Sequence, residues 1–95
     1  MSARKFKEKF DSAAKQSDKS YTVLTGRLKS LLNYYLKARK ITSFEQLCDL
    51  LVADKLKSCL GSQLLEHVLT VESDGTLTAS KISSLCDIFV ANRDD

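Results

Sequence analysis

The amino-acid sequence predicts an all-α protein, a compact bundle of about five helices with no significant sheet. Three observations support this fold class. The chain of 95 residues contains no Pro, the residue that most strongly interrupts a helix. Apolar residues recur at spacings of three and four along most of the chain, which is the period of an amphipathic helix. Short clusters of Ser, Thr, Asp and isolated Gly separate these periodic segments, as expected at helix ends.

The first helix is expected at residues 3–15. Phe6 and Phe10 form a narrow apolar stripe among Lys and Arg side chains, and Ser2 precedes the segment as a suitable N-cap. A polar connector over residues 16–20 follows.

The second helix, expected at residues 20–38, has the most regular apolar pattern in the chain. Ser20 can cap its start, and basic residues at its end complement the partial negative charge of a helix C-terminus. Its apolar positions are Tyr21, Leu24, Leu28, Leu31, Leu32, Tyr35 and Leu36.

The third helix is expected at residues 43–60. Thr42 and Glu45 have the spacing of a capping box, in which each side chain bonds the backbone N–H of the other residue. Apolar residues cover so much of the circumference that this helix is expected to contact more than one neighbouring element. Gly61 ends it.

Two further helices are expected at residues 62–70 and 78–91. A turn rich in Ser, Asp and Gly lies between them, and Thr78 can cap the last helix. Residues 71–77 could be extended, but a single strand has no partner with which to form a sheet.

The charge is distributed unevenly along the chain. Residues 1–60 carry 13 Lys or Arg against 6 Asp or Glu, a net charge of +7, whereas residues 61–95 carry 2 against 6, a net charge of −4. Halves of opposite sign favour packing against each other, within one chain or between two copies. This distribution weakens a simple nucleic-acid-binding interpretation.

Few residues offer catalytic or metal-binding chemistry. Cys48, Cys59 and Cys86 are too widely spaced for a disulfide framework or a CxxC metal site, and His67 is the only histidine. Because the three cysteines lie on apolar stripes, we interpret them as small buried hydrophobic residues. We expect no enzyme activity, no metal and no cofactor, and a thiol enzyme using Cys59 and His67 is the weakest alternative.

No apolar run approaches the roughly 18–20 residues that cross a bilayer, and no secretory segment follows Met1. We therefore expect a soluble protein with no membrane partner. The odd number of widely spaced cysteines indicates an intracellular, reducing environment.

A basic run at the end of the second helix supplies candidate phosphate contacts. Lys37, Arg39 and Lys40 lie near Tyr34 and Tyr35, which could stack on bases. Three cations are a small binding footprint, so we favour a solvated helix end with inward-packed tyrosines. Nucleic acid is not the partner we expect for this domain.

The second and third helices together carry more large apolar residues than one face of a small domain covers. Such an excess marks a protein interface, most simply that of a twofold homodimer.

Two segments form a longer pattern. Residues 28–36 read L-K-S-L-L-N-Y-Y-L, and residues 45–60 read E-Q-L-C-D-L-L-V-A-D-K-L-K-S-C-L. They resemble the L-R-E-L-C-x-x-W-L and E-Q-I-L-E-L-L-V-L-E-Q-F-L-x-x-L segments of the SCAN domain, a helical dimerisation module. The prolines usual in that family are missing and Tyr35 stands in place of its Trp. The chain therefore looks closer to the related C-terminal domain of retroelement Gag capsid proteins.

This resemblance implies a homodimeric self-association domain over residues 20–95, preceded by an N-terminal amphipathic helix and connector over residues 1–19. Exchange of the N-terminal part between subunits, higher-order capsid assembly and pairing with related SCAN-like domains are further options. The interface or interface-supporting positions that it implies are Leu28, Leu31, Leu32, Tyr35, Leu51 and Leu56.

The resemblance leaves the host protein open. A Gag capsid would place the domain in the cytoplasm, and a SCAN-type transcription regulator would place it in the nucleus. A weak basic nucleic-acid-binding domain is the remaining alternative.

Overall fold

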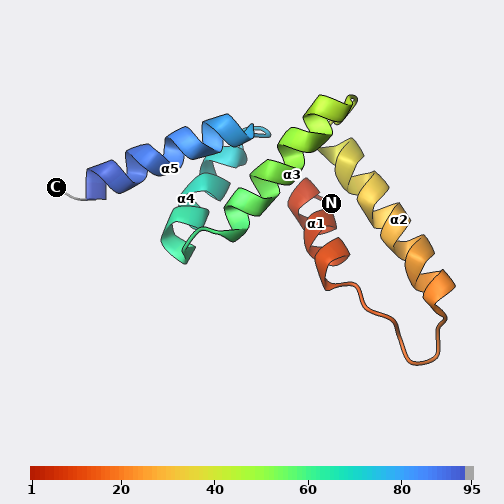
Figure 1. The fold of residues 1–95 in the computed structure, drawn as a ribbon. Coiled ribbons are helices and arrows are strands. Elements are labelled where there is room, and N and C mark those ends of the chain that lie inside the picture. The colour runs from red at the N-terminus through yellow and green to blue at the C-terminus, as the bar shows by residue number, and fades with distance from the viewer. Residues whose placement is uncertain (94–95) are drawn as a thin grey trace. The chain divides into compact units, whose positions relative to one another are not determined.

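The computed structural model describes residues 1–93. All regular structure in these residues is helical, with five helices and no strand (Figure 1). The predicted all-α class and the predicted number of helices are confirmed. The chain divides into two compact units, Met1–Thr42 and Ser43–Asp95, which we call unit 1 and unit 2.

Unit 1 is a helical hairpin in which α1 (Ala3–Ser12) packs against α2 (Tyr21–Ala38) (Figure 1). The predicted caps are confirmed, because Ser2 Oγ accepts the N–H of Lys5 and Ser20 Oγ accepts the N–H of Val23. These bonds satisfy backbone donors that have no partner within the helix.

The first helix ends three residues earlier than predicted. Ala13 has an extended backbone, with φ −63° and ψ 138°, and its N–H donates to the carbonyl of Phe10. The residues that follow belong to the connector, so the connector is longer than the sequence pattern indicated.

The last turn of α2 closes with a Schellman motif. The N–H of Ile41 donates to the carbonyl of Leu36 and the N–H of Lys40 donates to that of Lys37, each at 3.0 Å. Lys40 has φ +59°, the left-handed conformation that this motif requires and that Gly adopts most readily. The motif explains why α2 ends where the sequence predicted.

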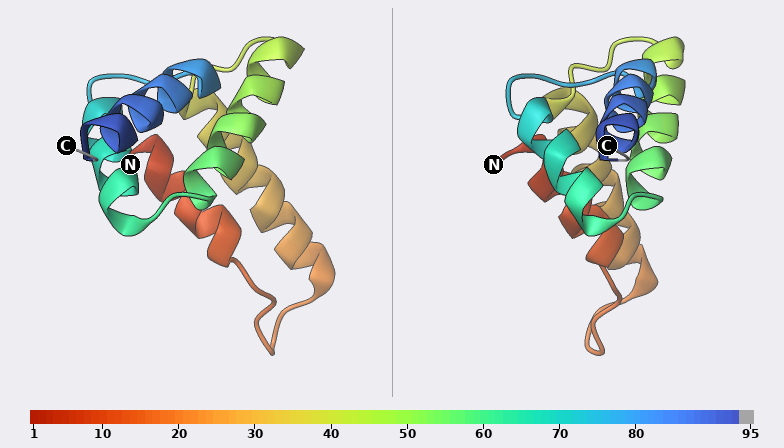
Figure 2. Two further views of the ribbon diagram at one scale, coloured as in Figure 1. Left: turned by 60° about the vertical axis from the view of Figure 1, so that its left-hand side comes forward. Right: turned by 90° about the vertical axis from the view of Figure 1, so that its left-hand side faces the viewer.

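Unit 2 contains α3 (Phe44–Ser58), α4 (Ser62–Glu72) and α5 (Ala79–Arg93), and α5 contacts both α3 and α4 (Figure 2). All three helices contribute to one buried cluster, formed by Ala53, Val68, Ile82 and Cys86. Partly buried residues around this cluster are Leu56, Leu60, Leu64, Leu77 and Ala79.

The predicted cap of the third helix was wrong by one residue. Ser43, not Thr42, is the N-cap of α3, and its Oγ accepts the N–H of Gln46 at 3.1 Å. Thr42 with Glu45 and Ser43 with Gln46 both have the spacing of a capping box, so the sequence pattern fits either start.

Polar contacts also join the helices of unit 2. The Asp49 carboxylate accepts the backbone N–H of Ala79 at 3.1 Å, which fixes the start of α5 against α3. Lys57 Nζ lies 2.5 Å from Glu72 Oε2, and both side chains are almost fully buried. This ion pair joins the last turn of α3 to the end of α4.

The ends of the last two helices lie close to their predicted positions. Gly61 is the N-cap of α4, and α4 continues to Glu72 instead of ending near residue 70. Thr78 caps α5 as predicted, since its Oγ1 accepts the N–H of Lys81. Of the segment 71–77 that could have been extended, the first two residues are helical.

Among residues 1–93, none of the helices combines the length and the apolar character that a membrane span requires.

Candidate functional site

The inner face of α3 belongs to the core of unit 2. Leu50 and Ala53 are buried, and Leu56 and Leu60 pack against the central cluster. Successive residues of a helix are about 100° apart, so Ala53 and Leu56, three residues apart, share one side of α3, and Leu60 follows just after the helix ends. The core therefore accounts for only part of the apolar surface of this helix.

A second apolar face lies on the opposite side of α3. Phe44 is 78% exposed, Leu51 is 61% exposed and Val52 is 58% exposed. Spacings of four, three, one, three and four residues keep six exposed positions together on this side. We call them the α3 stripe, and its members are Phe44, Cys48, Leu51, Val52, Lys55 and Cys59.

The α3 stripe contains two of the three cysteines. Cys48 and Cys59 are exposed, so the expectation that they are buried was wrong, whereas Cys86 is buried as expected. The reason is that only the inner face of α3 packs against the rest of unit 2. Burial raises the pKa of the Cys86 thiol, and the neighbouring Asp87 carboxylate raises it further.

The two interface positions that the family resemblance implied on α3 lie on different faces. Leu51 is at the centre of the stripe. Leu56 lies on the inner face, where it packs against the buried cluster of unit 2 and is not a member of the stripe.

The four implied positions on α2 are less accessible. Leu32 is 40% exposed, Leu28 and Leu31 are half-buried, and Tyr35 is 2% exposed. Leu32 is therefore the most exposed of the four.

Leu51 is the one member of the stripe that was predicted as an interface residue, and the other five were not. Phe44 and Cys48 lie seven and three residues before Leu51, and Val52 lies four residues after Cys48, so helical spacing connects all of them along one side of α3. That spacing was present in the sequence. What was missing was the knowledge that Leu51 points away from the core.

The candidate phosphate contacts at the end of α2 are not equivalent. Lys37 and Lys40 are exposed, whereas Arg39 is half-buried with its guanidinium 5.5 Å from the centre of the Tyr35 ring. Of the two tyrosines expected to pack inward, Tyr35 is buried and Tyr34 is 54% exposed.

The exposed Tyr34 also contributes to the hairpin of unit 1. Its ring stacks on the ring of Phe6, with centroids 5.5 Å apart and an angle of 22° between the ring planes. This stacking gives the narrow apolar stripe of α1 a partner on α2.

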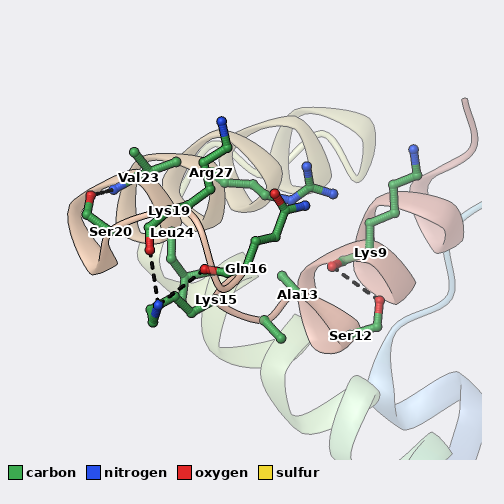
Figure 3. Close-up of a pocket in the computed structure, with 11 residues that line it drawn as sticks. Lys9, Ser12, Ala13, Lys15, Gln16, Lys19, Ser20, Val23, Leu24 and Arg27 are labelled. Atoms are coloured by element: carbon green, nitrogen blue, oxygen red, sulfur yellow. Dashed lines mark hydrogen bonds between the residues drawn. The ribbon is translucent and has the colours of Figure 1, made fainter.

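A positively charged hollow of about 450 Å³ lies in unit 1, between the end of α1, the connector and the first turns of α2 (Figure 3). Lys15 Nζ donates to the carbonyls of Gln16 and Lys19 and lies 5.4 Å from the centre of the Tyr21 ring. Among residues 1–93, no acidic residue lines the hollow. The cations that line it are Lys9, Lys15, Lys19 and Arg27.

The division into two units coincides with a change in charge. Unit 1 carries 11 Lys or Arg against 3 Asp or Glu, a net charge of +8, and unit 2 carries 4 against 9, a net charge of −5. The structural boundary therefore separates the charges more completely than the division after residue 60.

In the part of the chain that the structure describes, no three His, Cys, Asp or Glu side chains are grouped so that they could hold a metal ion. The single histidine, His67, is half-buried, and its ring centre lies 5.1 Å from that of Phe89. This ring contact gives His67 a packing role in unit 2.

No protein-family model, curated protein or solved structure matches the chain in comparisons with known proteins. The resemblance to SCAN domains and Gag capsid domains therefore remains a prediction from the sequence.

Proposed function

We propose that this chain is a non-enzymatic self-association module that forms homodimers. The observation that carries the proposal is the α3 stripe, in which Phe44, Leu51 and Val52 expose large apolar side chains opposite the core. Contiguous apolar surface of this kind marks a protein interface. The sequence resemblance of residues 28–36 and 45–60 to a dimerisation module supports the same function independently.

The size of the stripe predicts a weak dimer. From the area that large apolar side chains bury, the stripe offers on the order of 500 Å² per protomer, below the roughly 800 Å² of a standard stable interface. We therefore expect a dissociation constant in the range of about 10 μM to 1 mM. Assemblies that contain several copies would strengthen such a contact through avidity.

Sedimentation equilibrium over a wide concentration range tests the proposal. The expected result is an average mass that rises from the monomer value of 10.6 kDa toward twice that value as the concentration increases. A mass of 10.6 kDa at every concentration would refute homotypic association.

The Leu32→Asp variant tests whether α2 contributes to the interface, as the family resemblance implies. Leu32 is the most exposed of the implied α2 positions. If the α3 stripe alone forms the interface, this variant retains the wild-type dissociation constant. A monomeric Leu32→Asp protein with native helicity would extend the interface to α2.

A second candidate function is weak binding of phosphate groups by unit 1. The supporting observation is the hollow lined by the four cations Lys9, Lys15, Lys19 and Arg27, in a unit with a net charge of +8. We expect a labelled single-stranded oligonucleotide to bind with a steep salt dependence, measured by fluorescence anisotropy.

Matched variants locate this binding. Arg27→Ala, in the hollow, should weaken it, whereas Lys81→Ala, in unit 2, should leave it unchanged. A flat titration of the wild-type protein at low salt would dismiss the second candidate.

A further inference from the structure

We propose that α3 of one copy pairs with α3 of a second copy in antiparallel orientation, with the twofold axis crossing between Leu51 and Val52. This inference rests on the proposed self-association and specifies its geometry. The occupant of the α3 stripe is the same stripe on another copy of the chain.

The spacing of the stripe makes it self-complementary. Its intervals of four, three, one, three and four residues are the same when read in either direction. Reversing the helix about its midpoint therefore places every member of the stripe opposite another member. The resulting pairs are Phe44 with Cys59, Cys48 with Lys55, and Leu51 with Val52. A twofold interface requires this property, because one surface has to match itself.

The apolar content of these pairs is greatest at the axis. Leu51 and Val52 of both copies meet there, and each Phe44 ring covers the Cys59 position at the far end of the other helix. Two helices packed at the usual interaxial distance of about 8–10 Å would remove these side chains from water.

The single charge in the stripe favours the antiparallel orientation over the parallel one. In a parallel pair each Lys55 would face Lys55 of the second copy, which places two cations opposite each other. In the antiparallel pair Lys55 faces the uncharged Cys48. Glu45 of the second copy, exposed at the edge of the stripe, lies three residues before the Cys48 that Lys55 faces. The distance between these two positions is about 4.5 Å along the helix axis. A Lys side chain can reach across that distance to form an ion pair.

The two orientations place the cysteines differently. In the antiparallel pair Cys48 is displaced from Cys48 of the second copy by seven residues, about 10.5 Å along the axis. A disulfide needs Cα atoms within about 7 Å, so this pair cannot form one. In a parallel pair the two Cys48 residues would be opposite each other and could be oxidised to a disulfide.

Cysteine cross-linking distinguishes the two orientations. Three proteins are compared, all carrying Cys59→Ser and keeping the buried Cys86. Their exposed cysteines are Cys48 in the first, Lys55→Cys in the second, which also carries Cys48→Ser, and both Cys48 and Lys55→Cys in the third. Each is incubated with oxidised glutathione at a concentration where sedimentation shows dimers, then separated on a non-reducing gel. We expect covalent dimer as the major species only when both cysteines are present.

Internal controls make this result interpretable. A bond between Cys48 and Lys55→Cys within one chain is excluded because the two positions are about 10.5 Å apart along the same helix. Glu66→Cys with Cys48, in which the new cysteine is exposed on α4 outside the stripe, measures collisional cross-linking and should give no more dimer than Cys48 alone. The substituted positions are exposed, and circular dichroism checks that helicity is retained.

Each other outcome overturns a defined part of the account. Covalent dimer from either protein with one exposed cysteine contradicts the antiparallel orientation. Absence of covalent dimer from all three proteins, while the wild type sediments as a dimer, contradicts α3 pairing but leaves self-association standing. A wild-type protein that is monomeric at every concentration refutes the proposed function itself.

Discussion

Unit 1 and unit 2 differ in what holds their helices together. In unit 2, α3, α4 and α5 share a buried cluster around Val68 and Ile82 and a buried Lys57–Glu72 ion pair. Unit 1 is a hairpin in which the stacked rings of Phe6 and Tyr34 link α1 to α2. Three helices of unit 2 therefore share a cluster of buried side chains, whereas in unit 1 α1 has no buried residue and α2 has one, Tyr35.

The same comparison separates the two kinds of surface. The basic residues are concentrated in unit 1, where the hollow offers cations, and the α3 stripe lies in unit 2. An excess of apolar residues in a sequence therefore does not always mean a larger core. In α3 the excess forms a second face.

Truncation of the core of unit 2 should have the largest effect. Ile82 is fully buried, so Ile82→Ala should lower the free energy of unfolding of unit 2 by about 2–5 kcal/mol. Ile88→Ala on the same helix, where Ile88 is 59% exposed, should change it by less than about 0.5 kcal/mol. Hydrogen exchange should show that the backbone amides of α3, α4 and α5 lose protection in Ile82→Ala. An equal loss of protection in α1 and α2 would contradict the division into units.

The cysteines should differ strongly in reactivity. Cys48 and Cys59 should react with iodoacetamide in the folded protein, whereas Cys86 should react only after unfolding. Mass spectrometry of digests taken over time measures the three rates. Rapid alkylation of Cys86 in the native protein would contradict its place in the core.

The raised pKa of Cys86 also predicts a pH dependence. Burial favours the neutral thiol, so this contribution to stability is fully present below the ordinary thiol pKa and is lost as the pH rises through the higher folded-state value. The free energy of unfolding should therefore fall above about pH 9, and Cys86→Ala should remove part of that fall. If the free energy of unfolding of Cys86→Ala has the same pH dependence as that of the wild type, the thiol of Cys86 is not buried.

Helix capping should have a smaller effect and a clear matched control. Ser43→Ala should destabilise unit 2 by about 1 kcal/mol because the N–H of Gln46 loses its acceptor. Thr42→Ala should have less effect, since Thr42 is not the cap. Urea denaturation of both variants measures the difference, and the reverse order would restore Thr42 as the start of α3.

The smallest expected effect is a stabilisation in unit 1. Lys40 has a left-handed backbone, so Lys40→Gly should stabilise the end of α2 by roughly 0.5–1 kcal/mol after the added freedom of the unfolded chain is counted. Thermal denaturation followed by circular dichroism would detect it. A destabilised variant would show that the Lys40 side chain makes a larger contribution than its backbone costs.

Periodicity was sufficient to predict the five helices, because each has apolar residues at helical spacing and four of them follow a Ser or Thr cap. It was not sufficient to place the start of α3, where Thr42 and Ser43 begin overlapping capping boxes. It also could not separate the two apolar faces of α3, since Leu50 and Leu51 are equally apolar. The contact between Asp49 and Ala79, which no local pattern predicts, helps to fix which face is buried.

The most direct test of the central claim compares two charge substitutions by sedimentation equilibrium. Leu51→Asp places a carboxylate at the centre of the α3 stripe, and Ile88→Asp places one at an equally exposed apolar position of α5 outside it. We predict that Leu51→Asp is monomeric at concentrations where the wild type and Ile88→Asp form dimers, with native helicity in all three. Dimers of unchanged affinity in Leu51→Asp would contradict the assignment of the α3 stripe as the self-association surface.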